Sequence, residues 1–140
     1  MIVIDTNVAS EPLRLRPDER VTSWLSALTQ EDLFITSITV AEMLAGTAVM
    51  PDGRRKIGMS EGFEQLLREF FQDRILVFDE RSARLYAEIF ARTRAVGRGI
   101  TLFDCQIASI AMSQGFAIAT RDVRPFKDAG LDVINPWETA

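Results

Sequence analysis

Short apolar runs alternate with longer amphipathic stretches along the 140-residue chain. Five runs are typical of β-strands, because β-branched and aromatic residues are frequent in them and turn residues bound them. They are "IVI" at 2–4, "LFITS" at 33–37, "RILVFD" at 74–79, "FAIAT" at 116–120 and "LDVIN" at 131–135. Helical patterns separate the strands, so we predict one α/β domain over residues 1–140, with three α/β/α layers and a mostly parallel central sheet.

Apolar residues spaced three and four positions apart predict the helices. The first expected helix runs from Pro17 to about residue 28, and the second from a cap at Ser37 or Thr39 to residue 50. A third helix is expected at 60–71, and a long fourth helix begins at a cap at Asp79 or Ser82. The fifth covers 101–114 and ends at Gly115. Residues 7–20 are expected to be mostly irregular before the first helix, because two prolines discourage helix there.

Composition narrows the functional classes. The chain is 47% hydrophobic and 26% charged, an ordinary balance for a globular protein. No apolar run is long enough to span a membrane, and no basic and apolar leader precedes Asp5. The single cysteine, Cys105, forms no internal disulfide, so we expect a reducing, cytoplasmic location and no membrane contact.

The absence of histidine excludes His-based triads, His general bases and His metal ligands. Hydrolytic chemistry would then depend on carboxylates, a hydroxyl group or a metal held by oxygen atoms, for which Mg²⁺ (or Mn²⁺) is suited. The net charge of −4 disfavours a polyanionic partner, but three groups of basic residues stand out at 14–20, 54–56 and 92–98. They form either solvated surface or a basic rim around an acidic pocket.

Four acids are candidates for such a pocket. Asp5 ends the first strand and Asp122 follows the fourth, and the carboxyl ends of parallel strands share one edge of the sheet. Glu42 and Asp104 lie in predicted helices beside mostly small apolar residues, which indicates that Glu42 does not face solvent and that both carboxylates have room for a cofactor or substrate. Each acid alone has an ordinary explanation as a cap, a partner of a helix dipole or a loop residue.

Convergence of the four acids would raise one or more of their pKa values, and a divalent cation would relieve the repulsion. Such a cation can activate a water molecule and neutralise charge on a phosphate. Thr6, Asn7 and Thr120 are candidates for holding the carboxylates in place, and turn formation and capping explain them equally well.

Four motifs in order carry a resemblance to a known family. "VIDTNV", "ITVAEMLAG", "FDCQIASIAMSQG" and "IATRDVRPF" resemble the PIN-domain family over essentially the whole chain. Their spacing is similar to that of the VapC toxins of type II toxin–antitoxin systems, and "DTNVASEP" and "VINPWE" resemble the FitB-like branch. The departures are the bulky "GITLFD" before Asp104 and Arg121, where many members carry Asn.

The resemblance implies metal-dependent hydrolysis of RNA by an activated water, with Asp5, Glu42, Asp104 and Asp122 as metal-binding and catalytic acids. It also implies a homodimer and an antitoxin that inserts a basic side chain among these acids. A toxin–antitoxin hetero-oligomer would bind operator DNA through the antitoxin. Ionised carboxylates accept hydrogen bonds and donate none, so a group of them is suited to bind the donors of a basic side chain.

Three other interpretations stay open. A phosphatase with a nucleophilic Asp5 usually needs a second Asp two residues on, where this chain has Asn7. A catalytically degenerate PIN-like binding module would not need all four acids. A DNA-directed nuclease would use the same acids. Cys105 is expected in the core rather than as a nucleophile, because no histidine is available to activate it.

Overall fold

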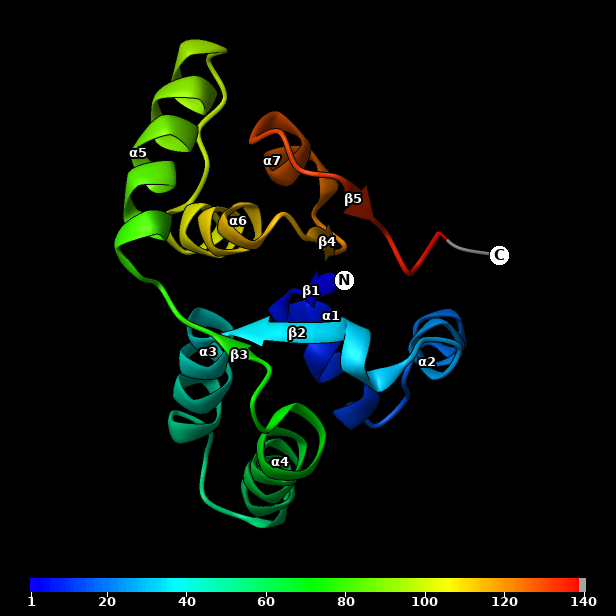
Figure 1. Cartoon of the computed structure of the whole chain (residues 1–140). Helices are drawn as coiled ribbons and strands as arrows, with labels where there is room; N and C mark the ends of the chain where they lie inside the picture. The colour runs from blue at the N-terminus through cyan, green and yellow to red at the C-terminus, as the bar shows by residue number, and fades with distance from the viewer. Residues whose placement is uncertain (139–140) are drawn as a thin grey trace.

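Five parallel strands form one sheet at the centre of the computed structural model, which describes residues 1–138 (Figure 1). The strands are β1 (Ile2–Ile4), β2 (Leu33–Thr36), β3 (Ile75–Leu76), β4 (Ala117–Ala119) and β5 (Val133–Ile134). Their order is β3-β2-β1-β4-β5, so β1 is central. Val3 of β1 is level with Phe34 on one side and Ile118 on the other. The predicted α/β class is confirmed, and the sheet is parallel in every pair.

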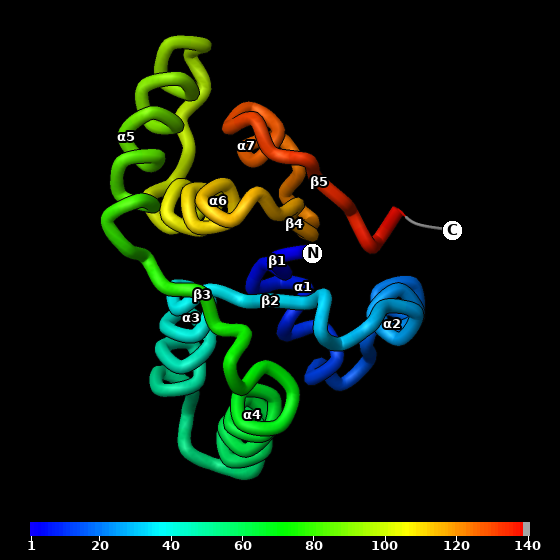
Figure 2. The backbone as a smooth tube through the Cα atoms, in the orientation of Figure 1, coloured from blue at the N-terminus to red at the C-terminus, as the bar shows by residue number. Residues whose placement is uncertain are grey.

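Helices cover both faces of this sheet (Figures 1 and 2). The α-helices are α1 (Thr6–Ser10), α2 (Glu19–Ser26), α3 (Ser37–Ala48), α4 (Arg54–Gln65), α5 (Glu80–Ala95), α6 (Leu102–Gln114) and α7 (Val123–Asp128). Short helical segments are η1 (Glu11–Leu13), η2 (Gln30–Asp32) and the π-helix η3 (Leu66–Phe71). Within residues 1–138 no helix is both long and apolar enough to cross a membrane.

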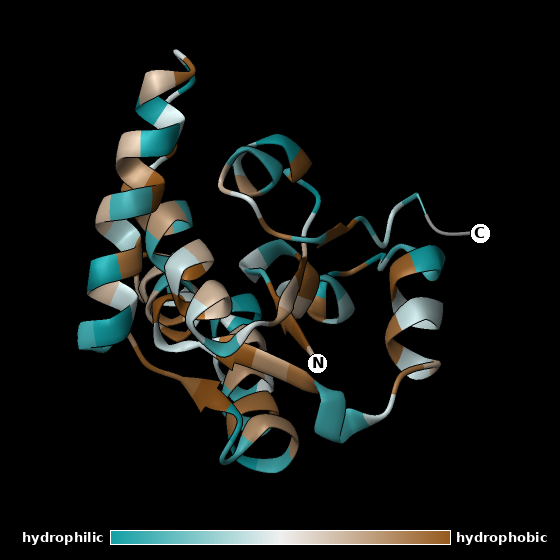
Figure 3. Ribbon diagram, turned by 45° about the horizontal axis from the view of Figure 1, so that its top comes forward, coloured by the Kyte–Doolittle hydropathy of each residue, from teal (hydrophilic) through white to brown (hydrophobic). Residues whose placement is uncertain are grey.

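Alternation along the strands divides the core into two layers, and the strands lie between apolar helix faces (Figure 3). Ile4 points into the layer formed with α1 to α4 and η3, where Phe63 and Phe71 are buried. Val3 points into the layer formed with α5, α6 and α7, where Ile89 and Phe126 are buried. Both faces of β1 are therefore shielded from water.

The segment after β1 is more helical than expected. Asp5 caps α1 by accepting a hydrogen bond from the Thr6 backbone N–H, and the 3-10 helix η1 follows directly. Pro12 lies in the first turn of η1, where a missing backbone N–H removes no helical hydrogen bond. The expectation of irregular structure over residues 7–20 was wrong for this part.

Other element boundaries also differ from the prediction. Thr36, rather than Ser37 or Thr39, caps α3 by accepting from the Thr39 N–H. The helix expected at 60–71 begins at Arg54 and ends in the π-helix. The third strand covers only two residues of the expected six, and α7 was not foreseen. Tertiary packing decides such boundaries more than local propensity.

Gly115 offers a direct test of backbone conformation. It ends α6 with a φ of 71°, in the left-handed region, and an added Cβ would meet nothing within 4 Å. Gly115→Ala should therefore lower the free energy of unfolding by about 1–2 kcal/mol through backbone strain alone. Gly58→Ala, in the exposed interior of α4, should raise it by about 0.5–1 kcal/mol. Urea unfolding of both variants measures this, and changes of the same sign would contradict the assignment.

Candidate active site

Asp5 is the buried centre of the candidate site. It follows β1 directly, and only 6% of the residue is exposed. Its Oδ1 accepts the Thr6 backbone N–H at 2.7 Å, and its Oδ2 accepts the Thr120 hydroxyl at 2.8 Å. Thr120 is fully buried and follows β4, the strand beside β1. Two neighbouring strand ends thus hold this carboxylate in one orientation.

Glu42 lies on α3, the helix that directly follows β2. Its Oε1 accepts the Thr6 hydroxyl at 3.0 Å, and this hydroxyl also lies 3.4 Å from that of Thr39. Glu42 is half-buried, which agrees only in part with the prediction that it does not face solvent, and the reason given for that prediction was wrong. Gly46 and Val49, which share its face of the helix, are exposed, so Glu42 borders an open groove rather than an apolar contact.

Asp104 lies in the first turn of α6, whose cap is the Thr101 hydroxyl, at 3.2 Å from the Asp104 backbone N. Asp104 is half-buried, and the following turns of α6 bury Ile107 and Ala108 in the core. Because the buried face anchors the helix, the carboxylate is held at the edge of the sheet.

Asp122 is exposed, and its backbone N–H donates to the Thr120 hydroxyl at 3.1 Å. Thr120 therefore joins the buried Asp5 to the exposed Asp122. Asn7 is exposed, and within residues 1–138 its side chain makes no hydrogen bond. Of the three predicted supporting residues, Thr6 and Thr120 contact the acids and Asn7 does not.

The electrostatics show that the four acids share one region. Burial raises the pKa of Asp5, and the charges of Glu42 and Asp122 raise it further, against the hydrogen bonds from Thr120 and Thr6. Burial also raises the pKa of Glu42, with a further contribution from Asp104. For Asp104, burial raises the pKa first, and the charges of Asp5 and Asp122 add to it. The four acids are therefore linked by pairwise charge repulsion, although no three of them form a close group among the described residues.

The candidate ligands have the chemistry that a hard divalent cation prefers. All candidate ligands are oxygen atoms, which suit Mg²⁺ or Mn²⁺. Among the described residues, no three acidic or cysteine side chains lie close enough to form a ready three-ligand metal site. Mg²⁺ commonly takes one or two carboxylates and keeps several waters, so a spaced set of acids fits it.

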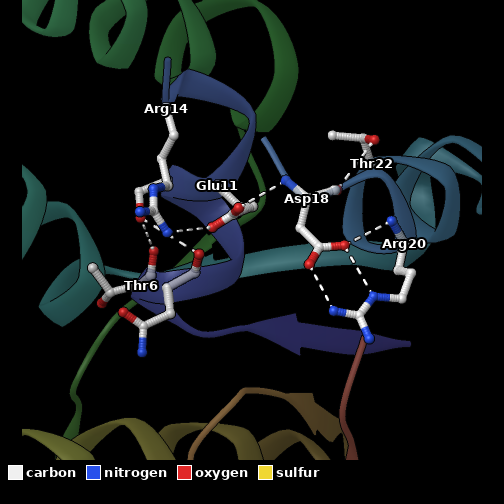
Figure 4. A network of polar contacts seen from close by, with 8 residues as sticks. Thr6, Glu11, Arg14, Asp18, Arg20 and Thr22 are labelled. Carbon is white, nitrogen blue, oxygen red and sulfur yellow. Dashed lines mark hydrogen bonds and ion pairs between the residues drawn. The ribbon is translucent and has the colours of Figure 1, made fainter. Parts of the chain in front are cut away.

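Members of two of the three basic groups form ion pairs with acids close to them in sequence. Arg14 lines a groove with Thr6 and Glu42, and it forms an ion pair with the buried Glu11 (Figure 4). Arg20 and Lys56 form ion pairs with Asp18 and Asp52. Cys105 is buried, and burial raises its pKa to about 11, which agrees with the expected core role.

Sequence reasoning did not identify Thr39 and Thr101 as neighbours of the acids. Thr101 could have been found, because a threonine three residues before an acid is a capping pattern, here "TLFD". Thr39 leaves no comparable signal, because its contact with Thr6 joins residues 33 positions apart.

Comparisons with known proteins agree with this architecture. The PIN domain family matches residues 2–131, so the chain belongs to the PIN-domain family. The "VapC ribonuclease Y4jK" of Sinorhizobium fredii is 43% identical over 140 residues, covering 100% of both chains. The "Toxin FitB" of Neisseria gonorrhoeae is 43% identical over 137 residues, covering 98% of this chain and 99% of FitB.

One solved structure, "Structure of FitAB bound to IR36 DNA fragment", superposes with a TM-score of 0.94 at 43% identity. The match covers 100% of this chain and 98% of the chain in that structure. The resemblance to the VapC group and its FitB-like branch is thereby confirmed.

Glu42 allows the cost of the acidic cluster to be measured. Its raised pKa means that the folded state binds this proton more tightly than the unfolded state does, so stability falls as the pH rises through the raised pKa. Glu42→Gln removes the charge and keeps an acceptor for Thr6. The metal-free variant should melt a few degrees above the parent protein at about pH 7, and the difference should shrink towards about pH 4.

Thermal melts in EDTA across this pH range measure the effect. The matched control is Glu88→Gln, which changes an exposed acid on α5 and should show no such difference. Equal melting temperatures of Glu42→Gln and the parent at neutral pH would contradict the cost of burying this charge near Asp104.

Proposed function

We propose that this protein is a metal-dependent endoribonuclease toxin of a type II toxin–antitoxin system. The observation that supports the proposal is the buried Asp5 at the carboxyl end of β1, whose pKa is raised by burial and by the charges of Glu42 and Asp122, while Asp104 is charge-coupled to Asp5, Glu42 and Asp122. Relatives over the full length of the chain are named as a ribonuclease and a toxin, which supports the same activity.

The four acids are proposed to hold Mg²⁺ (or Mn²⁺). When bound, such an ion supplies an activated water and offsets negative charge on the phosphate. The chain itself orients the donors: Thr120 and the Thr6 backbone fix both oxygens of Asp5. A carboxylate already fixed in place loses little entropy when it takes up its ligand.

Two of these acids, Glu42 and Asp104, are also suited to proton transfer. A carboxylate whose pKa is raised is a stronger base near neutral pH, which applies to Glu42 and Asp104. Both are half-buried and thus accessible to a water molecule that attacks the phosphorus atom. The products would carry 3′-hydroxyl and 5′-phosphate ends.

The same acidic cluster suggests how the enzyme is inhibited. An antitoxin that inserts an Arg or Lys side chain would neutralise the repulsion that the cation otherwise relieves. We further propose a homodimer and an assembly with the antitoxin on operator DNA. The FitAB complex, solved bound to a DNA fragment, supports such an assembly.

Cleavage of RNA by the purified protein tests the activity. The antitoxin-free protein should cut RNA with Mg²⁺ or Mn²⁺ and stop in EDTA. Asp5→Asn should lower the rate by at least about 100-fold, because the rigidly held charge is lost. The control Asp73→Asn, an exposed acid before β3, should cut normally. Full activity in EDTA, or an active Asp5→Asn variant with an unchanged circular dichroism spectrum, would refute the proposed chemistry.

Growth of a bacterial host tests the biological role. Expression of the chain alone should arrest growth, and the Asp104→Asn variant at the same protein level should not, because toxicity depends on cleavage. Colony counts after induction measure this. Equal arrest by both proteins would show that toxicity has another cause.

A further inference from the structure

Arg121 is the basic residue closest in sequence to the candidate acids. It lies between the buried Thr120 and the exposed Asp122, at the carboxyl end of β4. The Arg121 side chain is exposed and forms no ion pair with any carboxylate in residues 1–138. A cation thus stands next to Asp122 in the chain, directly after β4, and no carboxylate among the described residues forms an ion pair with it.

An aromatic ring holds Arg121 in place. The guanidinium carbon lies 4.4 Å from the centre of the Trp137 ring, within cation–π distance. Trp137 is 5% exposed and belongs to the buried layer beside α2, and its backbone N–H donates to the Asn135 side chain at 3.1 Å. The indole N–H has no hydrogen-bond partner among the described residues. Trp137 therefore contacts Arg121 through the face of its ring and not through a hydrogen bond.

A carboxylate on α2 completes this environment. Asp18 has its pKa lowered to about 2, chiefly by the hydrogen bond from the Arg20 side chain (Figure 4), and the charge of Arg121 adds to this lowering. The C-terminal segment lies beside α2 (Figure 2). Trp137 therefore holds the Arg121 guanidinium by its ring face, and Asp18 lies near enough to feel its charge without forming an ion pair with it.

We propose that Arg121 binds a backbone phosphate of the RNA next to the one that is cut, and that Trp137 is its positioning residue. The inference rests on the proposed nuclease function. RNA is a polyanion and the chain carries a net charge of −4, so a local cation is needed beside the four acids. A guanidinium matches a phosphate with two parallel hydrogen bonds. Such a contact adds affinity without reading the base sequence.

Binding of a fluorescent single-stranded RNA in EDTA, followed by anisotropy at several salt concentrations, isolates this contact from cleavage. Arg121→Gln should weaken binding about tenfold at low salt. It should also reduce the slope of log K against log salt by roughly 0.7, the value for one phosphate contact on a single strand. Two unrelated RNA sequences should be affected equally. Arg121→Lys, which keeps the charge but not the paired donors, should lose less.

The matched control is Arg68→Gln, with the same change of charge on η3, before β3, at the opposite edge of the sheet from the acids. It should leave the affinity and the salt slope unchanged. Trp137→Leu should weaken binding as Arg121→Gln does, and the double variant should be no weaker, because both changes remove one contact. In cleavage assays Arg121→Gln should raise KM and leave kcat within about twofold.

The outcomes separate the two proposals. If the parent protein cuts RNA and Arg121→Gln binds it with unchanged affinity and salt slope, the phosphate role is wrong and the nuclease function stands. A lowered melting temperature of Arg121→Gln with unchanged affinity would show that Arg121 only fastens the C-terminal segment, which also overturns the inference. If the parent protein cuts no RNA in either metal, the proposed function fails, whatever Arg121 binds.

Discussion

The buried carboxylate of Asp5 is the constraint on which the arrangement around it depends. A charge in the interior costs free energy unless hydrogen bonds or an opposite charge compensate it. The fold supplies two hydrogen bonds, from Thr120 and from the Thr6 backbone, and yet the pKa of Asp5 stays above its usual value. The compensation is incomplete, and three further acids add to the negative charge. Carboxylates with incompletely compensated charge and raised pKa values mark this region as a candidate functional site rather than as part of the stable core.

The site becomes progressively more open from its centre outward. Asp5 is buried, Glu42 and Asp104 are half-buried, and Asp122 is exposed. This gradient holds the donors rigidly at one end and leaves the other end open to solvent. Under the proposed function it would also separate the roles of charge, with the acids facing a metal and Arg121, which is exposed, facing a phosphate. Stability and function therefore make opposite demands on the same few residues.

Much of this could be read from local pattern. The run "MIVID" predicts a buried strand that ends at an acid, and β1 and Asp5 agree with it. The alternation of strands and helices predicts the parallel sheet, and Gly115 ends α6 in the left-handed conformation expected of a helix stop. The placement of Glu42 was only partly right, and for a mistaken reason, since periodicity cannot tell a face that packs from one that lines a groove. The helix α1 was missed because its start depends on the Asp5 cap rather than on apolar periodicity.

The sequence by itself determined the strand–helix order, the oxygen-only chemistry of the site and the four acids to consider, because these follow from residue type and short-range spacing. Only the tertiary structure decided that Thr120 holds Asp5 across 115 residues, that Thr6 contacts Glu42, and that Trp137 lies under Arg121. The physical reason is that these contacts join residues distant along the chain. Strand order and helix packing set such distances, and no local pattern encodes them.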